Sequence, residues 1–304
     1  MIHRWHILGA GAMGRLLACQ LAAAGLDICL VTRAGPAATF SQALDDLSQR
    51  RQLTLARIGA DNLRACDVAG LWVTTKANDA LQAVLSVLPA LAPDAPVILM
   101  HNGMGVREQL VANAPSLQPY SAITTAGAYL DQTYDGAEPL LVHAGRGITR
   151  VGGNRTDAPA WFSAVSREPT GMRWEADIDR ALWDKLLINC AINPLTAIHR
   201  CRNGALGAEP ALWKQVVALC GELTQVSIAR GHVCNESDLL ARTRQVIDAT
   251  AANQSSMLRD VVEGRPTELD AITGFLLREA RRLQVPCPLN SALYERLDGL
   301  QPSY

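Results

Sequence analysis

The sequence feature that most constrains the fold is a glycine-rich turn set between an apolar run and a helix-forming stretch. Residues 5–8 are apolar, Gly9–Gly14 reads GAGAMG, and a helix-forming stretch up to Gly25 leads to a second apolar run at 27–32. A lone G-x-G-x-x-G match is weak. In this order of strand, turn, helix and strand, however, such a loop is typical of a site for a dinucleotide pyrophosphate at the helix N-terminus. The alternative is a tight turn without a ligand. The candidate cofactor loop is Gly9, Ala10, Gly11, Ala12, Met13 and Gly14.

The residue that follows the second apolar run distinguishes between the two nicotinamide dinucleotides. An NAD site of this kind places an acidic residue about 20 residues past the glycines, where it binds the ribose 2′-hydroxyl. The chain has Arg33 there, and the next carboxylates are Asp45 and Asp46. The planar, charged guanidinium of arginine suits a 2′-phosphate. We therefore predict NADP(H), with an ordinary exposed arginine as the alternative.

Two further apolar runs extend the predicted sheet. Runs at 70–75 and 96–100 alternate with a helical pattern at 80–88. Strands and helices in alternation imply a parallel, doubly wound sheet, in which ligands bind at the carboxyl ends of the strands. Lys76 and Asn102 come just after these two runs and are candidate site residues. Taken singly, each has an ordinary interpretation, as a solvated charge and as an Asn before Gly in a turn.

The remainder of this part of the chain carries a different pattern. Ser41–Arg51 is polar, and we interpret it as a helix. Between Ser121 and Gly152 apolar runs follow one another without a helix, and Asp135-Gly136 and Arg146-Gly147 supply turns. This pattern predicts an antiparallel extension of the sheet.

A break marked by Pro169 and Gly171 separates this region from one that is helical only. The predicted helices lie at about 177–200, 209–231, 236–252, 256–264, 267–284 and 289–299. The predicted fold class is therefore α/β. A Rossmann-type doubly wound sheet with its antiparallel extension occupies residues 1–173, and an all-helical domain for substrate and catalysis occupies residues 174–304.

Composition argues against several classes of function. With a formal net charge of −1 and no block of Lys or Arg, neither nucleic acid nor an anionic membrane is an expected partner. No apolar run is long enough to span a bilayer, and we find no export signal. The eight cysteines are scattered without a C-x-x-C pair, which argues against zinc or a disulfide framework. We predict a cytoplasmic protein that holds no metal.

A polar row on an otherwise apolar helix marks the second candidate site. Residues 181–195 read ALWDKLLINCAINPL, and Lys185, Asn189 and Asn193 stand four residues apart. Each step of four advances about 40° past a full turn, so the three side chains form one slowly drifting row on a single face. An ammonium and two amides on a buried helix are costly unless polar groups meet them. The alternative is a half-buried helix whose polar face contacts water.

Several segments together carry a family resemblance. They are HILGAGAMG at 6–14, TTKA at 74–77, HNGMG at 101–105, HAGRGITRVG at 143–152, LWDKLLINCAINPLTAI at 182–198, and SSMLRD with RPTELD at 255–270. These segments resemble the ketopantoate reductase (2-dehydropantoate 2-reductase) family along essentially the whole chain. The resemblance implies a Rossmann domain joined to an all-helical domain. It also implies reduction of ketopantoate to pantoate with NADPH, on the route to pantothenate.

The resemblance also implies roles for single residues. Lys185 matches the family's general acid. The residues that match its substrate contacts are Asn102, Asn189, Asn193, Asn203 and Ser256. The residues that match its cofactor contacts, besides the glycine loop, are Arg33, Lys76, Asn102, Ala128 and Glu268. Ala128 would line the cofactor through its backbone, and Glu268 would lie near the nicotinamide ribose. Glu268 has an ordinary alternative, in which Pro266 starts a helix and the carboxylate complements its dipole.

The chemistry of a ketone reduction agrees with this assignment. Hydride delivery to a ketone carbon builds negative charge on oxygen, so a donor must wait there and pass on a proton. Lys185 is the only cation in the polar row. Two alternatives stay open: a reductase of a related branched 2-oxo acid or imine, and a non-catalytic module that senses NADP(H). We expect a monomer or a homodimer.

Overall fold

The computed structural model describes residues 4–47 and 49–300, and its chain divides into two compact units. The first unit holds Met1–His101 and Val106–Ala181, and the second holds Asn102–Gly105 and Leu182–Tyr304. The short segment Asn102–Gly105 therefore belongs with the helical part of the chain. The assignment of cofactor binding to residues 1–173 and of substrate chemistry to residues 174–304 stays a prediction.

The first unit is built on a sheet of 11 strands in the described part of the chain, ordered β11-β10-β7-β6-β5-β1-β2-β4-β3-β9-β8. The strands are β1 (Trp5–Leu8), β2 (Ile28–Thr32), β3 (Ala38–Asp46), β4 (Gln49–Gly59), β5 (Leu71–Val73), β6 (Val97–Leu99), β7 (Tyr120–Thr124), β8 (Gly127–Asp131), β9 (Leu140–Gly145), β10 (Thr149–Gly152) and β11 (Met172–Trp174). All neighbours from β7 through β6, β5, β1 and β2 to β4 pair in parallel. The predicted parallel sheet is confirmed.

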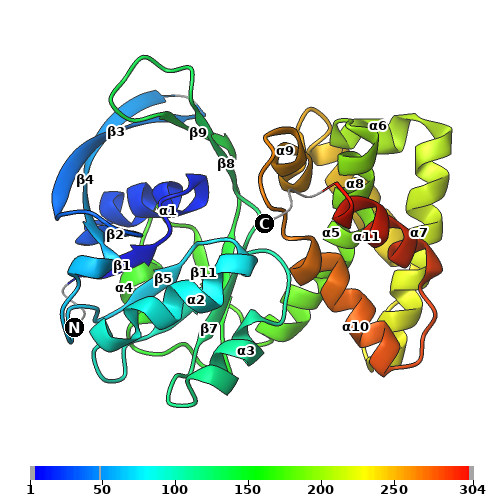
Figure 1. Ribbon diagram of the computed structural model, residues 1–304. Helices are drawn as coiled ribbons and strands as arrows, with labels where there is room; N and C mark the ends of the chain where they lie inside the picture. The colour runs from blue at the N-terminus through cyan, green and yellow to red at the C-terminus, as the bar shows by residue number, and fades with distance from the viewer. Residues whose placement is uncertain (1–3, 48, 301–304) are drawn as a thin grey trace. The chain divides into compact units, whose positions relative to one another are not determined.

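The helices of this unit are α1 (Ala12–Ala23), α2 (Ala77–Val87), α3 (Val106–Asn113) and α4 (Phe162–Val165), with 3-10 turns at Ala60–Asn62 and Leu88–Ala90. Helix α1 contacts β1, β2, β4, β8 and β9, so the sheet curls around it (Figure 1). Its apolar side is fully packed, with Leu16, Leu17 and Leu21 buried in the core of the unit. The helix that follows the glycine turn is thus held from several sides.

The prediction of a helix at Ser41–Arg51 is wrong. Strands β3 and β4 form a long antiparallel hairpin there, with Phe40 opposite Leu55 and Leu44 opposite Arg51. The hairpin is continued by pairing at both flanks, because β4 lies parallel to β2 and β3 lies parallel to β9. Such partners come from distant parts of the chain, and tertiary pairing overrides a local helix propensity.

The predicted antiparallel extension is confirmed, although its strands lie at both ends of the sheet. Strand β7 pairs antiparallel with β10 near one end, and β8 pairs antiparallel with β9 at the other. The apolar run that includes Ser121 is therefore two strands, interrupted at Thr125 and Ala126. The two strands on either side of this two-residue break, β7 and β8, lie toward opposite ends of the sheet.

The second unit is helical, as predicted. Its elements are α5 (Ile178–His199, from Leu182 on), α6 (Asn203–Ala208), α7 (Pro210–Ala229), α8 (Glu236–Ala249), α9 (Ser256–Val262), the π-helix Asp270–Gly274, α10 (Phe275–Arg282) and α11 (Pro288–Asp298). Its core includes Trp183 and Leu187 of α5 with Leu219 and Leu223 of α7. Across the described ranges, none of the helices combines the length and apolarity needed to cross a membrane.

Candidate active site

The glycine loop of the first unit requires glycine at two positions for reasons internal to the protein. Gly9 has a φ of +110°, a conformation that L side chains rarely adopt, and a Cβ there would lie 2.8 Å from the backbone nitrogen of Thr75. A Cβ on Gly14 would lie 2.0 Å from the carbonyl oxygen of Gly9. The hydroxyl of Thr74 donates to that same oxygen at 2.8 Å. The start of α1 therefore packs directly against the end of β1.

Gly11 differs from these two, because the protein itself does not require a glycine there. Its φ of −73° and ψ of −177° are open to any residue, and among the described residues, the adjoining chain aside, no atom lies within 4 Å of a Cβ placed there. Gly11 is also the N-cap of α1, and no side chain caps that helix end. Open space in front of an uncapped helix N-terminus fits a pyrophosphate. The loop residues that the sequence singled out, Gly9–Gly14, thus fit a dinucleotide.

The other predicted cofactor contacts of the first unit lie in two places. Arg33 is exposed, directly after the end of β2. Lys76 is half-buried and forms the N-cap of α2, shortly after the end of β5. Since β5, β1 and β2 are parallel neighbours, both residues and the glycine loop share one edge of the sheet. Ala128 lies elsewhere, in the edge strand β8, opposite His143.

In the second unit, the polar row lies on α5 as the spacing predicts. Lys185 and Asn189 are half-buried, and Asn193 is buried with 7% of its surface exposed. The intervening side chains of Leu187, Cys190 and their neighbours belong to the core of the unit. The row therefore runs into the protein at its Asn193 end, which a simple water-facing helix surface would not require.

The titration of Lys185 is shifted by its surroundings. Burial lowers the pKa of Lys185 to about 8, and the nearby charge of Glu268 opposes part of that shift. A lysine that titrates close to neutral pH holds its proton and can also release it, as a general acid requires.

Glu268 is itself buried, with 8% of its surface exposed, and binds Asn102 twice. The Nδ2 of Asn102 donates to one carboxylate oxygen at 2.8 Å, and its backbone nitrogen donates to the other at 3.2 Å. Glu268 lies before the π-helix, and Pro266 lies outside any helix. The carboxylate therefore holds a side chain from a distant segment. The backbone carbonyl oxygen of Glu268 also accepts from the nitrogen of Ile272 at 3.0 Å at the start of the helical turn, so the alternative that its charge complements the helix dipole stays open.

The segment Asn102–Gly105 is fastened to the π-helix by its backbone. The nitrogen of Met104 donates to the carbonyl oxygen of Ala271 at 2.9 Å. Gly103 has a φ of +84°, and a Cβ there would lie 2.3 Å from that same oxygen. Single π-turns inside helices are frequent at functional sites. Here Glu268 lies two residues before the π-helix, and Asn102–Gly105 is bonded to Ala271 within it.

Two further predicted residues lie at helix starts. Asn203 is buried at the start of α6, where its Nδ2 donates to the hydroxyl of Thr250 at 2.9 Å. Its Oδ1 has no hydrogen-bond partner among the described residues. Ser256 is exposed at the first position of α9, while Ser255 is buried and caps that helix. The hydroxyl of Ser256 is therefore exposed, whereas that of Ser255 is engaged in the cap. The Oδ1 of Asn203 can still accept a hydrogen bond.

Sequence reasoning missed the residues that support this arrangement. The Ser255 hydroxyl is bonded to that of Thr196 on α5 at 2.7 Å, which ties the start of α9 to the helix of the polar row. The signal was available, since a serine before an apolar helical run is a typical N-cap. On the other side of the π-helix, Arg278 donates to Asp270 at 2.8 Å and the Tyr294 hydroxyl donates to it at 3.3 Å.

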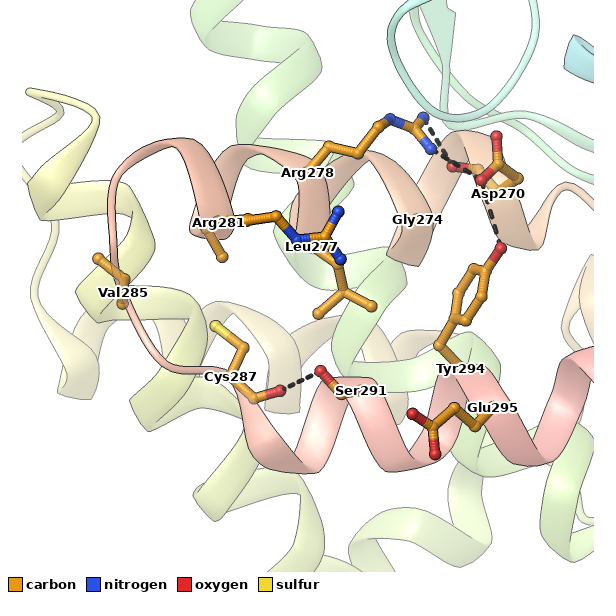
Figure 2. Close-up of a pocket in the computed structure, with 11 residues that line it drawn as sticks. Asp270, Gly274, Leu277, Arg278, Arg281, Val285, Cys287, Ser291, Tyr294 and Glu295 are labelled. Atoms are coloured by element: carbon orange, nitrogen blue, oxygen red, sulfur yellow. Dashed lines mark hydrogen bonds and ion pairs between the residues drawn. The ribbon is translucent and has the colours of Figure 1, made fainter.

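Asp270 and Tyr294 also line a cavity of about 500 Å³ between the π-helix, α10 and α11 (Figure 2). Arg281 and Cys287 line it as well, and burial raises the pKa of the Cys287 thiol to about 11. None of the predicted site residues lines this cavity. It is a feature of the helical unit separate from the polar row.

Comparison with known proteins identifies the family. The family model for "Ketopantoate reductase PanE/ApbA" matches residues 5–155, and the one for "Ketopantoate reductase PanE/ApbA C terminal" matches residues 177–301. The chain belongs to the ketopantoate reductase family. The 2-dehydropantoate 2-reductase of Vibrio cholerae is 37% identical over 304 residues, which cover 98% of this chain and 98% of that protein.

Solved structures agree with the ketopantoate reductase fold. A probable 2-dehydropantoate 2-reductase of Bacillus subtilis is 26% identical and has a TM-score of 0.78, with 98% of this chain and 100% of that chain covered. D-mandelate dehydrogenase, solved with NADH and anilino(oxo)acetate, has a TM-score of 0.85 at 19% identity, with 98% and 97% covered. The predicted resemblance is confirmed, and the chain is a nicotinamide-dependent oxidoreductase of this family.

Within the ketopantoate reductase family assignment, the structure brings some predicted residues together and leaves others apart. Asn102 and Glu268 are hydrogen-bonded, and the charge of Glu268 acts on Lys185. Asn193 lies on the same helix as Lys185, two turns further on. The glycine loop, Arg33, Lys76 and Ala128 belong to the first unit. The role of each residue stays a prediction.

Proposed function

We propose that this chain reduces ketopantoate to pantoate with NADPH, and that Lys185 supplies the proton. The observation that carries the proposal is the lysine of the polar row, whose pKa burial lowers to about 8 beside the carboxylate of Glu268. When bound, the reduced nicotinamide supplies a hydride to the ketone carbon. Lys185 Nζ donates a proton to the ketone oxygen as negative charge develops there, and solvent then returns the proton to the amine.

Glu268 has two tasks in this scheme. Its charge favours the protonated form of Lys185, which the reduction direction needs. Its two hydrogen bonds also fix the Asn102 side chain and backbone. Asn102 would then face substrate or nicotinamide in a set orientation.

Neutral polar groups would recognise the substrate. Ketopantoate carries a carboxylate and a hydroxyl besides its ketone, and amides and hydroxyls can donate to one and accept from the other. Asn203 offers an unpaired Oδ1, which is an acceptor for a hydroxyl group. Ser256 offers an exposed hydroxyl at the first turn of α9. Asn189 and Asn193 complete the proposed set on α5.

The choice of NADPH over NADH rests on Arg33, because the fold does not decide it. D-mandelate dehydrogenase shares the fold and was solved with NADH. In this chain an exposed arginine follows β2, at the sheet edge where the glycine loop also lies. A guanidinium there favours a ligand with a 2′-phosphate.

Changing Arg33 to Ala tests this preference. We expect the KM for NADPH to rise about 10–100-fold, the effect of losing one or two hydrogen bonds to a charged group, while NADH kinetics stay nearly unchanged. Steady-state kinetics with both cofactors measure it. Arg4→Ala is the matched control, because Arg4 is also exposed but precedes β1, at the amino end of the parallel strands. An equal loss with both cofactors would make Arg33 structural.

Changing Glu268 to Gln tests the electrostatic coupling. The Glu268 charge raises the pKa of Lys185, so its removal lowers that pKa below about 8. Since the protonated lysine is the active form, the alkaline loss of kcat must move to lower pH. Measured pH–rate profiles check this shift. Glu263→Gln is the control, because Glu263 is exposed and pairs with Arg265. An unmoved alkaline limb would separate Glu268 from the titration of the proton donor.

The rival functions are separated by one assay. Turnover of NADPH with ketopantoate, followed by its absorbance, excludes a non-catalytic NADP(H) sensor. A comparison of several branched 2-oxo acids, with and without ammonia for imine formation, ranks the alternative substrates. Differences of one methyl group in a pocket amount to about 1–3 kcal/mol, so the preferred substrate must exceed its analogues by at least tenfold in kcat/KM.

A further inference from the structure

Arg15, in the N-terminal turn of α1, lies in a buried network that the reaction scheme does not use. Its side chain is 11% exposed. Its Nε donates to the carbonyl oxygen of Ala10 at 2.9 Å, inside the glycine loop. One terminal nitrogen donates to Gln42 at 2.5 Å and to Glu138 at 2.9 Å. The guanidinium is thus fixed at both ends.

Glu138 is the centre of the network. Its carboxylate is 14% exposed and also accepts from Arg57 of β4 at 2.7 Å. The ring of Phe40 contacts both cations, at 5.3 Å from the Arg15 guanidinium and 5.0 Å from that of Arg57. Desolvation, the largest influence, raises the pKa of Glu138, but the bonds and charges of the two arginines bring it below its ordinary value. Glu138 is therefore ionised and holds Arg15 by a charge-assisted bond.

Gln42 fixes the same guanidinium from β3. Its side chain is fully buried, and its Nε2 donates to the carbonyl oxygens of Ala43 and Pro139, both at 2.9 Å. Its Oε1 is left to accept from Arg15. Since every polar atom of Gln42 is engaged, the amide has one orientation. The network therefore joins α1, the β3–β4 hairpin and the connection between β8 and β9.

The position of Arg15 is unfavourable by itself. A cation at a helix N-terminus is opposed by the helix dipole, and no acidic side chain lies in the first turn of α1. Burial of a charge adds a desolvation cost that only good partners offset. A role for Arg15 in holding the conformation of the glycine loop, which it contacts at Ala10, would explain why this cost is accepted.

The bond to Ala10 has a consequence for its neighbour Gly11. The carbonyl of Ala10 and the N–H of Gly11 belong to one planar trans peptide, so they point in opposite directions. Anchoring the carbonyl on Arg15 therefore directs the Gly11 N–H away from Arg15. Gly11 is the N-cap of α1 and has open space around its Cβ position.

We propose that Arg15, held by Glu138 and Gln42, is a positioning residue for the cofactor pyrophosphate. It sets the Ala10–Gly11 peptide so that the Gly11 N–H is oriented for a phosphate oxygen before the dinucleotide binds. The inference rests on the proposed dinucleotide function. It assigns the network a role that the glycine motif does not contain.

Binding measurements on two variants test the proposal. Arg15→Met keeps an unbranched stem against Phe40 and removes the guanidinium, and Glu138→Gln keeps the shape of the side chain and removes its charge. Titration calorimetry gives the Kd for NADPH, NADH and adenosine 2′-monophosphate, which lacks the pyrophosphate. We expect Arg15→Met to raise the Kd of both dinucleotides about tenfold, the effect of one charge-assisted hydrogen bond, and to leave that of adenosine 2′-monophosphate unchanged.

Glu138→Gln separates positioning from simple attraction. If Arg15 acted only as a positive charge near the phosphates, removal of the compensating carboxylate would tighten dinucleotide binding. Positioning predicts weaker binding of both dinucleotides instead, because the guanidinium loses its charged anchor. Arg4→Met is the control, since it breaks an exposed ion pair with Asp27 in the same unit. Thermal unfolding of each variant identifies any that fail to fold.

The results distinguish the positioning role of Arg15 from the proposed function on which it rests. Unchanged dinucleotide binding in Arg15→Met, tighter binding in Glu138→Gln, or an equal loss with adenosine 2′-monophosphate would overturn the proposal. Wild-type protein that binds neither dinucleotide would instead contradict the proposed function itself. Wild-type protein that binds NADH as tightly as NADPH would contradict only the cofactor preference, and the NADH data would still test Arg15.

Discussion

A Lys185→Met enzyme is expected to reduce ketopantoate about 10²–10⁴-fold more slowly than wild type at saturating substrate, the range that general acid catalysis contributes. Methionine keeps a long unbranched stem against the half-buried helix face and removes the ammonium. NADPH affinity should change little. The substrate KM should rise as well if the ammonium already binds the ketone oxygen before hydride transfer. Steady-state kinetics and a separate NADPH titration measure these effects.

The pH profile gives an independent signature of the same residue. Burial lowers the pKa of Lys185 to about 8, so the proton donor is present below that pH and is lost as pH rises through it. Wild-type kcat for reduction should fall on the alkaline side of about pH 8, and that limb should be absent in Lys185→Met. Lys214→Met is the matched control, because Lys214 is exposed on α7 and should keep both kcat and the limb.

A folded Lys185→Met enzyme that binds NADPH and turns over at nearly the wild-type rate would remove Lys185 from the chemistry. The polar row of α5 would then be a structural feature only. The buried end of that row at Asn193 would still need polar partners, so Asn189 and Asn193 would be the next residues of the row to change.

The features that could be predicted from sequence are those specified by residues close together in the chain. The spacing of Lys185, Asn189 and Asn193 defines one helix face, and α5 begins and ends within one residue of the predicted bounds at 177–200. The glycine turn at Gly9–Gly14 likewise needs only its flanking strand and helix. Both signals are local, so no knowledge of tertiary pairing was needed.

The features that could not be predicted depend on distant partners. Strands β3 and β4 lie where the polar sequence Ser41–Arg51 favoured a helix, because β9 and β2 pair on their two sides. Asn102 is held by Glu268, 166 residues away in the chain. Asn102–Gly105 consequently belongs with the helical unit, although it follows a strand of the sheet. Contacts at such separations leave no periodicity in the sequence.

The Arg15 network shows the same limit within a recognised motif. The motif explains why Gly9, Gly11 and Gly14 are glycines, but it is silent about the next side chain. Arg15 is held by Glu138, which lies 123 residues further along the chain. A residue beside a strong local signal can therefore carry a long-range function that only the fold displays.

Substitutions in the glycine loop should also have large effects, and these should differ because Gly14 is required for packing and Gly11 for the ligand. A Cβ on Gly14 would lie 2.0 Å from the Gly9 oxygen and 2.5 Å from the Thr74 hydroxyl, so Gly14→Ala must push α1 away from β1. Overpacking against backbone costs about 1–3 kcal/mol or more, and we expect the thermal transition of the protein without cofactor to fall by roughly 5–10 °C. Differential scanning calorimetry measures it.

Gly11→Ala should show the opposite pattern. Apart from the adjoining chain, a Cβ there meets no atom of the described residues within 4 Å, and its backbone angles suit alanine, so the protein without cofactor should keep its wild-type Tm. The added methyl would instead occupy space that a pyrophosphate needs. Losing about two hydrogen bonds to a charged group should raise the Kd of NADPH on the order of 100-fold. Wild-type NADPH affinity in a stable Gly11→Ala protein would place the phosphates elsewhere. Because the two glycines are three residues apart in one loop, each variant serves as the control for the other: one should report on packing of the helix, and the other on the ligand in front of it.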